Sequence, residues 1–469
     1  MKRKEDIYYA AMLARDHRFD GKFFVGVKTT GIYCRPICPA KPKRENVEFF
    51  NDYLSAEKAG FRPCMRCRPE SAPMSGAWLG KSAMVQRAVK IINHQETINF
   101  NEEEFAEIFG VSSRHLRRVF VQEIGKTPKQ LAFENRLNVA RKLIVETSLP
   151  ITQIVFGAGF QSIRRFNSAF KERFKQNPSE IRRLKVSKKS ALIISLAYRP
   201  PYDYEGIYQS YKNHRMGLLE RFENGKMIRV IQFDKKTGEI TISHNPKNSC
   251  IDVEIDFPDT SFIHVILAKV RVLFDLDSDP LLISNSLETH EGMKKLIAKH
   301  PGIRLPSGWD SFEVAVATIL GQLVSVEFGR TLVHDLIELL GEDSGLFYED
   351  KPIKLFPTPK KIADADLSSL KTTEIRKTTL KFFASAVALK KISLEPTQDI
   401  EKFYQDVRKI RGIGPWTASY MALKAIRHTD AFPETDLILK RALEKYPLTA
   451  INEMGPWRGY AAALLWKER

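Results

Sequence analysis

Two short pairs of cysteines stand near the beginning of the chain, Cys34-x₃-Cys38 and Cys64-x₂-Cys67. Two such pairs separated by a loop supply the four thiolates of a tetrahedral Zn²⁺ site. Disulfide bonds are the alternative, but the sequence opens without an apolar signal segment and has no stretch long enough to span a bilayer. In a reducing cytoplasm, paired cysteines bind metal or react more often than they bridge. We therefore expect a cytoplasmic protein without membrane contact, in which these four cysteines bind Zn²⁺.

A second candidate centre lies near the other end of the chain. In Arg411-Gly-Ile-Gly-Pro-Trp-Thr-Ala, Gly412 and Gly414 would let the backbone approach a phosphate, with the amides of the next helix pointing at it. Asp436 follows in Pro-Glu-Thr-Asp-Leu, a sequence that suits the start of a helix. Asp436 is therefore either a carboxylate kept ionised by the positive end of that helix or simply its cap.

The charge of the chain is unevenly distributed along its 469 residues. The whole chain has 74 Lys and Arg against 56 Asp and Glu, a net charge of +18. Residues 1–189 hold 36 of these basic and 19 of these acidic residues, so they carry nearly all of the excess. A merely soluble basic surface would not explain so sharp a division. The first part of the chain is therefore expected to bind a polyanion.

The chain is too long for a single core, and its patterns divide it into four segments. Residues 1–75 hold the cysteine pairs and end in a small-residue stretch, 71–77, that is typical of a linker. Residues 81–187 have helical periodicity, 190–278 contain strands near 192–198, 228–233, 239–243 and 251–257, and 279–469 are helical again. The predicted fold is multidomain α+β, with a small zinc domain, an all-α domain, a small antiparallel β (α+β) domain and an α-helical domain.

Two helix-turn-helix units follow one another in the basic segment 81–187. Their turns are expected at 110–112 and 157–160, and Phe166, Phe170 and Phe174 form an apolar stripe at helical spacing. The outer faces are either solvated charge or, as the doubled unit favours, two recognition helices for successive major grooves. The candidate DNA-binding residues on these faces are Arg114, His115, Arg117, Arg118, Ser162, Arg164 and Arg165.

The sequences VSSRHLRRVFVQEIGKTPKQ (111–130) and GAGFQSIRRFNSAFKERFKQNPSEIRR (157–183) resemble the DNA-binding domain of AraC-type transcription activators. The resemblance covers about 105 residues and implies a double helix-turn-helix domain at 81–187. It also implies that the second helix of each unit, near 113–122 and 162–173, contacts DNA.

The cysteine segment, with GIYCRPICPAKPKRENVEFF and AGFRPCMRCRPE, resembles the N-terminal domain of the Ada methyl-phosphotriester repair proteins. That resemblance implies that Cys34 irreversibly accepts a methyl group from a methylated DNA phosphate, while the other three cysteines remain ligands. A zinc-bound thiolate is deprotonated and nucleophilic, and methylation removes one negative charge beside the DNA. The alternative is an inert structural zinc site. The residues that would hold adjacent phosphates are Arg35, Lys41, Lys43 and Arg44.

The last 280 residues resemble the helix-hairpin-helix DNA glycosylases, most closely the AlkA alkylpurine glycosylases, through SFEVAVATILGQLVSVEFGRTLV (311–333), RGIGPWTASYMALKAIRHTDAFPETDLILKR (411–441) and GPWRGYAAALLW (455–466). The implied reaction is hydrolysis of the N-glycosidic bond to a flipped alkylated base, with Asp436 stabilising the sugar cation. Electron-rich rings would select cationic bases, and these are Trp416, Tyr420 and Trp466. Leu323 matches the residue that wedges into the emptied stack.

Two departures from family patterns limit what the resemblance implies. The lyase branch of these glycosylases carries a Schiff-base lysine where this chain has Trp416, so we expect a monofunctional glycosylase that leaves abasic sites. AlkA has an aromatic residue just after the catalytic aspartate, whereas this chain has Leu437, which puts the range of bases in question. The remaining cysteine, Cys250, lies in the strand segment and is expected in the core.

The sequence thus predicts an alkylation-response protein that binds Zn²⁺, promoter DNA and alkylated double-stranded DNA. We expect it to act as a monomer and to contact RNA polymerase. One alternative is a transcription activator whose glycosylase-like half only binds DNA, and base release separates the two. Another is a pure repair enzyme whose helix-turn-helix domain grips DNA without sequence preference, and footprinting on a promoter separates that one.

Overall fold

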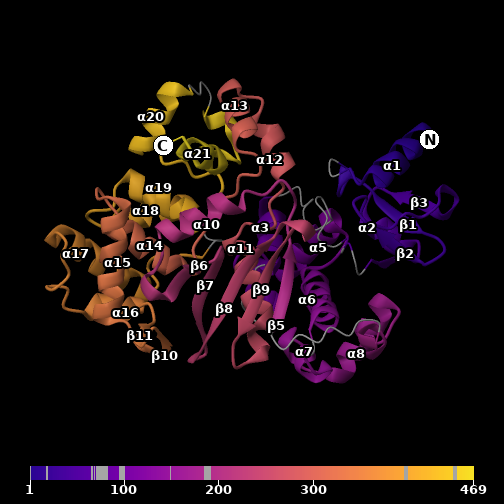
Figure 1. The fold of residues 1–469 in the computed structure, drawn as a ribbon, viewed down its shortest axis with the longest axis horizontal. Coiled ribbons are helices and arrows are strands. Elements are labelled where there is room, and N and C mark those ends of the chain that lie inside the picture. Colours follow the sequence, from indigo (N-terminus) through magenta and orange to yellow (C-terminus); the bar gives the residue numbers. More distant parts are fainter. Residues whose placement is uncertain are drawn as a thin grey trace. The chain divides into compact units, whose positions relative to one another are not determined.

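The structure is a computed structural model, and it describes residues 2–16, 19–64, 67, 69, 83–93, 101–147, 149–183, 192–395, 400–446 and 451–468. The chain forms two compact units, residues 1–194 with 260–268 and residues 195–259 with 269–469. The expected linker at 71–77 lies outside the described residues, as do the predicted boundaries at 75, 81, 187 and 190. Figure 1 labels the helices and strands of both units.

The zinc domain is a four-stranded sheet of order β3-β1-β2-β4 with two helices. Strand β1 pairs antiparallel with β2 and β3, whereas β2 pairs parallel with β4. Phe23 and Phe24, both fully buried, point into separate small aromatic clusters. The elements are α1 (Lys2–Ala14), β1 (Phe24–Val27), β2 (Ile32–Cys34), β3 (Val47–Phe50), α2 (Tyr53–Lys58) and β4 (Arg62–Pro63).

The following described helices form the two helix-turn-helix units and confirm the double unit predicted from the sequence. In the first unit, Asn101 caps the helix Glu102–Glu107 by accepting from Glu103 N at 3.0 Å. Leu116 and Phe120 of the following helix, Ser113–Ile124, are fully buried. Each recognition helix is capped by a serine, and α6 begins with a Thr127–Gln130 capping box. The helices are α3 (Ala83–Asn93), α4 (Glu102–Glu107), α5 (Ser113–Ile124), α6 (Pro128–Glu146), α7 (Ile151–Gly157), α8 (Ile163–Phe174) and α9 (Pro178–Arg183).

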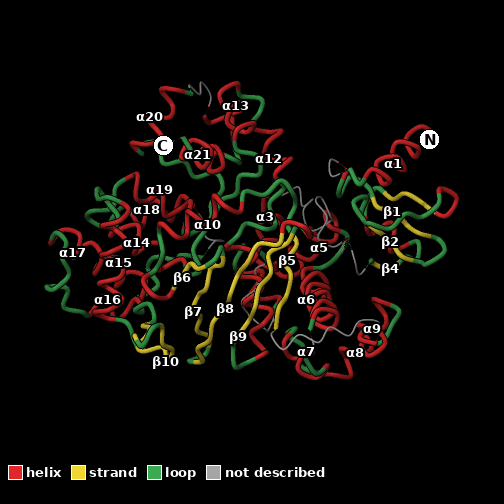
Figure 2. The backbone as a smooth tube through the Cα atoms, in the orientation of Figure 1, coloured by secondary structure: helices red, strands yellow, loops and turns green. Residues whose placement is uncertain are grey.

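A five-stranded sheet of order β5-β9-β8-β7-β6 follows, drawn in yellow in Figure 2. In β9 the apolar residues Ile251, Val253 and Ile255 are buried while the acidic residues between them are not, which confirms the predicted two-faced strand. Cys250 is 4% exposed, as expected for a core thiol. The elements are β5 (Leu192–Ala197), α10 (Tyr204–Asn213), β6 (Glu220–Glu223), β7 (Lys226–Phe233), β8 (Lys236–Asn245), β9 (Cys250–Asp256) and α11 (Ile263–Leu273).

The remaining residues are helical, apart from one hairpin that the sequence reading missed. Strands β10 (Asp343–Tyr348) and β11 (Lys351–Lys354) pair antiparallel, and β6 was also not predicted. All three are short and rich in charged residues or in Gly and Pro, so they lack a periodic apolar pattern. The helices are α12 (Pro280–Leu287), α13 (Glu291–Lys299), α14 (Ser311–Leu320), α15 (Val326–Leu340), α16 (Pro359–Asp364), α17 (Glu374–Ala388), α18 (Ile400–Val407), α19 (Pro415–Lys424), α20 (Leu437–Lys445) and α21 (Arg458–Trp466).

Helix α14 is the centre of this helical core. Its residues Ala315, Val316 and Ile319 are fully buried, and it packs against α15, α17 and α19. Phe312 at its start stacks on Phe383 of α17, with ring centroids 6.0 Å apart. A helix buried on most of its surface is a rigid support, so the turns that follow α14 and precede α19 have fixed positions.

Candidate zinc centre and candidate active-site cavity

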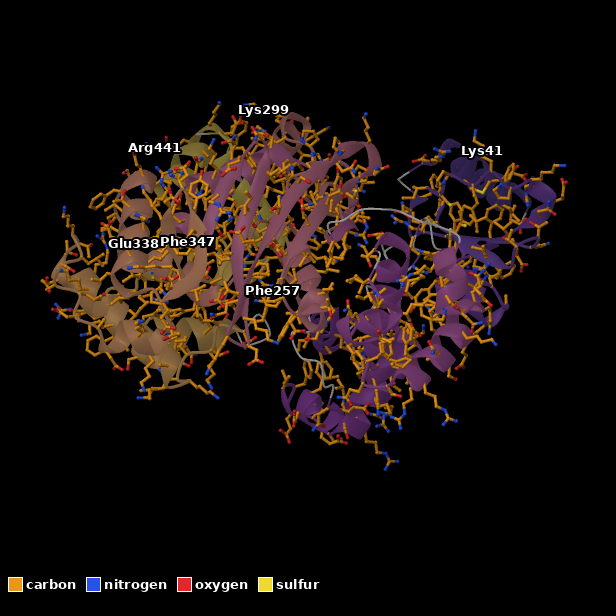
Figure 3. The ribbon with its side chains drawn as sticks, turned by 60° about the horizontal axis from the view of Figure 1, so that its bottom comes forward. Lys41, Phe257, Lys299, Glu338, Phe347 and Arg441 are labelled. Atoms are coloured by element: carbon orange, nitrogen blue, oxygen red, sulfur yellow. The ribbon has the colours of Figure 1, made fainter. Side chains whose placement is uncertain are left out.

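The four cysteines predicted to bind zinc lie together at the end of β2 and after β4. Their sulfur atoms are all within 4.8 Å of one another, and three of the four residues are buried. Tetrahedral Zn–S bonds of about 2.3 Å place sulfurs about 3.8 Å apart, so the cluster fits a Zn²⁺ ion. Figure 3 shows Lys41 on the surface of the same domain, and its side chain is exposed.

Arg35 supports this cluster from inside the domain. Its side chain is only 6% exposed, its Nε donates to Asp20 Oδ1 at 2.8 Å, and a second bond joins it to the other oxygen of Asp20. Its backbone N–H donates to Cys67 Sγ at 3.3 Å, and Nη1 donates to Cys67 O at 3.3 Å. The prediction that Arg35 holds a DNA phosphate is therefore not supported by its placement, because its charge is buried against Asp20.

Lys43 and Arg44, two other residues predicted to contact phosphates, differ in how closely other side chains hold them. The Lys43 side chain is 80% exposed, and its nearest carboxylate oxygen, on Glu45, is 4.0 Å away. Arg44 instead donates to Glu5 at 2.8 Å and lies 5.3 Å from the centre of the Phe49 ring. Lys43 is thus the more available of the two for a phosphate.

The predicted recognition helices present basic surfaces, as expected. Exposed side chains at the start of α5 and α8 are those of Arg114, His115, Arg117, Arg118, Arg164 and Arg165. Arg117 also forms an ion pair with Glu102 at 2.8 Å, and Arg118 lies 3.3 Å from a ring nitrogen of His115. Ser162 differs from the others, because its hydroxyl accepts from Arg165 N and caps α8. Its role in the helix is therefore structural, whatever it contacts in DNA.

Asp436 caps the helix that follows it, which was one of the two interpretations that the sequence left open. Its Oδ1 accepts from the backbone N–H groups of Ile438 and Leu439, both at 3.0 Å, so it caps α20. The indole of Trp416 donates to Oδ2 at 2.8 Å, and that of Trp466 donates to Oδ1 at 3.2 Å. Four N–H donors therefore fix the position of one carboxylate that is 8% exposed.

The three predicted base-binding rings form one aromatic group around Asp436. Trp416 and Tyr420 are stacked, with centroids 5.2 Å apart and planes 24° apart. Tyr420 and Trp466 are 5.8 Å apart with planes tilted by 57°. The structure thus brings Asp436, Trp416, Tyr420 and Trp466 together from three elements, the sequence positions of which span 50 residues.

These residues line a cavity of about 790 Å³. Its walls come from α10, α14, α15, α19, the loop 303–309 and the start of α20. Ile438 lies in the wall, whereas Leu437 is 62% exposed and is not among the lining residues. The described residues therefore include a cavity that is large enough for a flipped base.

Leu323 stands at a strained position between α14 and α15. Its side chain is fully exposed, at 102% relative accessibility, and its backbone has a positive φ of 53°. Such a conformation is unfavourable for a leucine, and an exposed leucine gains nothing from packing. The side chain of Gln322, beside Leu323, donates to Gly412 O at 3.0 Å and to the Thr417 hydroxyl at 2.7 Å. These bonds connect the turn after α14 to the turn that precedes α19.

The two glycines in the turn between α18 and α19, Gly412 and Gly414, differ in conformation and surroundings. Gly412 has a φ of 95°, and a Cβ there would lie 2.1 Å from the hydroxyl of Thr379, which itself donates to Arg411 O. Gly414 precedes α19 with an ordinary φ of −89°, and a Cβ there would meet nothing within 4 Å. Protein packing therefore explains Gly412 but not Gly414, the surroundings of which are open to a ligand.

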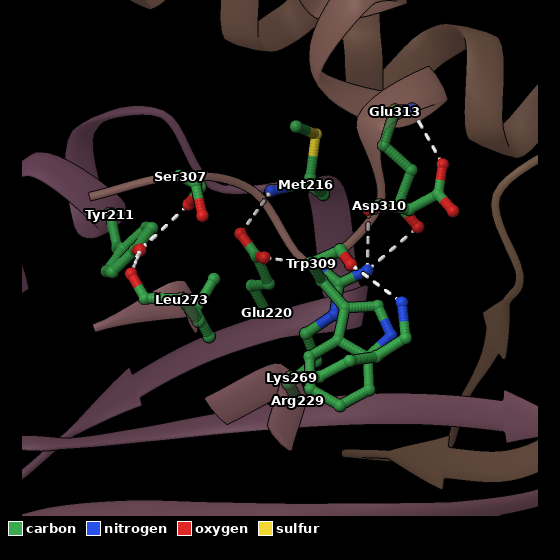
Figure 4. Close-up of polar contacts among 10 residues, drawn as sticks. All are labelled: Tyr211, Met216, Glu220, Arg229, Lys269, Leu273, Ser307, Trp309, Asp310 and Glu313. Carbon is green, nitrogen blue, oxygen red and sulfur yellow. Dashed lines mark hydrogen bonds and ion pairs between the residues drawn. The ribbon is translucent and has the colours of Figure 1, made fainter. Parts of the chain in front are cut away.

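Sequence reasoning missed several charged residues that line the cavity. Figure 4 shows the contacts of three of them, Arg229, Glu220 and Glu313. Arg229 of β7 lies between two buried carboxylates, bonding to Glu220 and, at 2.6 and 2.8 Å, to Glu313. Burial raises the pKa of Glu313 to about 7 although Arg229 opposes the shift. Lys424 of α19 also lines the cavity. A single lysine in a helix does not by itself indicate a functional site. The one available indication was its spacing, because Lys424 follows Trp416 and Tyr420 at intervals of four residues.

Comparisons with known families divide the chain as its motifs do. Residues 7–70 match the metal-binding domain of Ada, 105–184 match a helix-turn-helix domain, and 193–310 match the AlkA N-terminal domain. The last match continues beyond residue 278, where we placed the end of the β domain. None of the described helices is both long and apolar enough to cross a membrane.

Relatives match both the whole chain and its parts. DNA-3-methyladenine glycosylase 2 of Escherichia coli is 28% identical over 58% of this chain and 96% of its own length. The bifunctional transcriptional activator/DNA repair enzyme Ada of E. coli is 35% identical over 33% of this chain and 43% of its own length. A solved 3-methyladenine DNA glycosylase from Archaeoglobus fulgidus shares the fold of the second half, with a TM-score of 0.51 at 18% identity, covering 59% of this chain and 97% of that one.

One relative extends over nearly the entire chain. The probable bifunctional transcriptional activator/DNA repair enzyme AlkA of Mycobacterium tuberculosis is 32% identical over 478 aligned residues, which cover 98% of this chain and 95% of the relative. The three matched domains occur in the order that the sequence predicted, and the four cysteines form the expected zinc site. The chain therefore belongs to the family of bifunctional transcriptional activator/DNA repair enzymes AlkA.

Proposed function

We propose that this protein excises alkylated purines from DNA and activates repair genes when its zinc domain is methylated. The observation that carries the excision is the Asp436 carboxylate at the wall of an aromatic cavity, with two indole donors and two backbone donors fixing it. A module that only binds DNA has no need for a buried anion beside a base-sized cavity. This geometry favours the glycosylase over the alternative in which the second half is a binding module.

The excision step uses Asp436 as an electrostatic partner. A purine alkylated at N3 or N7 is cationic, so it leaves with the bonding electrons as a neutral base when the N-glycosidic bond breaks. The deoxyribose is left with a positive charge, which the fixed Asp436 carboxylate stabilises without reorganising. Water then adds to the anomeric carbon and loses a proton, which gives an abasic site and a free base. Trp416, Tyr420 and Trp466 hold the cationic base by cation–π contact.

Asp436→Asn tests this role. Asparagine keeps the size of the side chain and an oxygen for capping α20 but removes the charge. We expect release of 3-methyladenine and 7-methylguanine from methylated DNA to fall by at least about 100-fold, while DNA binding is retained. Equal release by the variant would remove Asp436 from its role. Absence of release by both proteins would leave the second half as a binding module.

We further propose that excision is monofunctional. A lyase needs a neutral amine that attacks the sugar, and two lysines are among the described residues that line the cavity. Lys467 Nζ is paired with Asp203 at 2.6 Å, and Lys424 Nζ donates to Pro306 O at 3.2 Å. Burial lowers the pKa of Lys424 to about 8, so at pH 7 this amine is still mostly protonated. At pH 7 borohydride should therefore not trap the protein on damaged DNA, and the product should be an unnicked abasic strand. A trapped complex that Lys424→Met abolishes would contradict this.

For the zinc domain, we propose that the Cys34 sulfur attacks the methyl carbon of a methyl phosphotriester. The S–C bond forms as the C–O bond breaks, and the phosphodiester anion leaves with the bonding electrons. Bound zinc would keep the thiolates deprotonated at neutral pH. Arg35 N donates to Cys67 Sγ, which withdraws charge from that sulfur, whereas the described backbone amides place no such bond on Cys34. This difference supports Cys34 as the acceptor.

Mass analysis of the N-terminal peptides after exposure to methylated DNA tests the acceptor. We expect one added methyl group on Cys34 and none on Cys67, with Cys34→Ser blocking the transfer. A methyl group on another cysteine would reassign the acceptor, and no transfer would leave an inert zinc site. We also propose that the protein activates transcription at a promoter, contacts RNA polymerase and acts as a monomer.

A further inference from the structure

The wall of the cavity carries a cation that the excision step does not use. Trp416, Tyr420 and Lys424 recur every four residues along α19, so all three lie on the face of that helix that lines the cavity. The ammonium of Lys424 lies 5.8 Å from the centre of the Trp466 ring. Lys424 is therefore part of the aromatic group around the base position, not of the outer surface.

Only part of the hydrogen-bonding capacity of the Lys424 ammonium group is used by the described residues. Its Nζ donates to Pro306 O at 3.2 Å. The bonds among the described residues give this nitrogen no carboxylate partner, although Asp275 attracts it from a greater distance, and an ammonium group has three N–H donors. A partly buried cation with unused donors beside a cavity needs a partner, and an acceptor atom of a bound base supplies one.

The position of Lys424 also affects whether the aromatic group binds a cationic or a neutral base more tightly. A cation on a base inside the cavity meets the positive charge of Lys424, and the Trp466 ring that would attract it already faces this ammonium. A neutral damaged base meets no repulsion and offers a carbonyl oxygen or ring nitrogen as an acceptor. Lys424 therefore favours neutral bases over cationic ones, in opposition to Asp436 and the aromatic rings.

We propose that Lys424 determines the charge selectivity of the cavity, donating a hydrogen bond to a neutral damaged purine and so extending excision beyond cationic alkylpurines. This inference rests on the proposed glycosylase function. It assigns Lys424 a specificity role in base binding and no part in breaking the glycosidic bond.

The test compares two duplexes of identical sequence with the full-length protein. One carries 7-methylguanine, which is cationic, and the other carries 1,N6-ethenoadenine, which is neutral, and single-turnover release is measured at pH 7. Lys424→Met should lower release of ethenoadenine by about 10-fold or more, the value of one charged hydrogen bond, without lowering release of 7-methylguanine. Lys424→Arg, which keeps a charged donor, should retain the wild-type ratio within about threefold.

A pH profile of ethenoadenine release provides a readout that a structural role would not change. Burial lowers the pKa of Lys424 to about 8 although Asp275 opposes the shift. Wild-type release should therefore fall between pH 7 and 9 as the amine loses its proton, whereas Lys424→Arg should show no such fall. The other charged or titratable groups near Lys424 or in the cavity wall are the same in wild type and in Lys424→Arg, so their titration changes both pH profiles alike. These groups are Asp436, Tyr420, Asp275, Tyr460, Arg304, Tyr211, Glu220, Glu313, Arg229, Arg215, Arg330, His214, Glu205, Asp203 and Lys467.

The outcomes separate this inference from the function on which it rests. Equal losses for both bases in Lys424→Met, or matching pH profiles for wild type and Lys424→Arg, would overturn the role of Lys424. Wild type that releases 7-methylguanine but no ethenoadenine would also overturn it. Wild type that releases neither base, like Asp436→Asn, would overturn the glycosylase function itself. If Lys424→Met does not fold, Lys424→Arg and the pH profile still decide.

Discussion

At the scale of single residues, Asp436 shows how one side chain can cap a helix and line a cavity. One oxygen accepts both backbone bonds that cap α20, and the other accepts the Trp416 indole. The cap fixes the rotamer, so the carboxylate is oriented before any base arrives. Catalysis by electrostatic stabilisation depends on such preorganisation, because a carboxylate that must first reorient loses part of its effect.

Leu323 leads to a prediction in which stability and activity change in opposite directions. Replacing it with glycine removes the strain of a positive φ, which costs a leucine about 1 kcal/mol. We therefore expect Leu323→Gly to leave the free energy of unfolding unchanged or higher, because the exposed side chain contributes no packing. Without the wedge, base release from duplex DNA should fall by about 10-fold or more.

Thermal unfolding and release from duplex and single-stranded substrates check this prediction. Single-stranded release should change little, because no stack has to be filled. A loss on both substrates, or a lower melting temperature, would show that Leu323 supports the fold instead of the DNA. The nearby exposed Val326, in the first turn of α15, provides a control substitution.

How far the sequence predicts this site depends on whether a residue acts through its neighbours in the chain. The cysteine pairs, the aromatic stripe of α8 and the position of Asp436 before a helix were all predictable, since each depends on local spacing. The placement of Arg35 was not, because its partner Asp20 lies fifteen residues earlier and nothing local distinguishes a buried arginine from an exposed one. In the Arg229 cluster, Arg229 bonds to Glu313, which lies 84 positions later, so the cluster has no local pattern.

At the scale of elements, the hairpin before α19 offers a matched pair of substitutions. Gly412→Ala should destabilise the second unit by about 1–2 kcal/mol or more, because it combines an unfavourable φ with a clash against Thr379. Gly414→Ala has an ordinary φ and open space, so it should leave the melting temperature unchanged or slightly higher.

DNA affinity, unlike stability, should be sensitive to the substitution at Gly414. If the backbone at Gly414 approaches a phosphate, Gly414→Ala should weaken binding to abasic DNA at unchanged stability. Binding is measured by fluorescence anisotropy, and stability by the thermal transition in tryptophan emission. Unchanged affinity for Gly414→Ala would show that DNA stays away from this backbone.

The end of α21 is fixed by one acidic residue, which makes its stability dependent on pH. Glu468 accepts from Lys299 at 2.6 Å, from His300 at 2.9 Å and from Tyr446 at 2.9 Å. The bonds from Lys299 and His300 lower its pKa from 4.5 to about 2. A lowered carboxyl pKa stabilises the folded state above about pH 4.5, and this contribution is lost as the pH falls toward 2.

Glu468→Gln should therefore lower the melting temperature at neutral pH. The difference from wild type should shrink below pH 4.5, become small near pH 2 and vanish below it, where Glu468 is fully protonated and both side chains are neutral. Tryptophan emission reports on this region because Trp466 lies two residues before Glu468. A difference that stays constant with pH would show that the charge of Glu468 is not what stabilises this end.

At the scale of the whole molecule, the uneven charge separates sensing from excision. The first 189 residues carry most of the net charge, and they hold the zinc site and both recognition helices. We expect the second unit to recognise damage through its cavity and the Asp436 carboxylate, which require shape and local charge instead of net charge. Separate electrostatic designs explain why the family matches end and begin near the same place in the chain, at 184 and 193.

This separation predicts how methylation of Cys34 should act on DNA binding. Methylating one thiolate removes one negative charge near the DNA, which is worth about 1 kcal/mol for a phosphate about 5 Å away in water. We therefore expect the methylated protein to bind promoter DNA about fivefold more tightly at low salt, with the advantage shrinking as screening increases. Base release by the second unit should stay the same, since its cavity residues lie in other elements. Titrations of methylated and unmethylated protein across a salt series measure both effects, with Cys250→Ser as the control. An advantage of several orders of magnitude that persists at high salt would require a conformational change in addition to charge, because one screened charge cannot supply it.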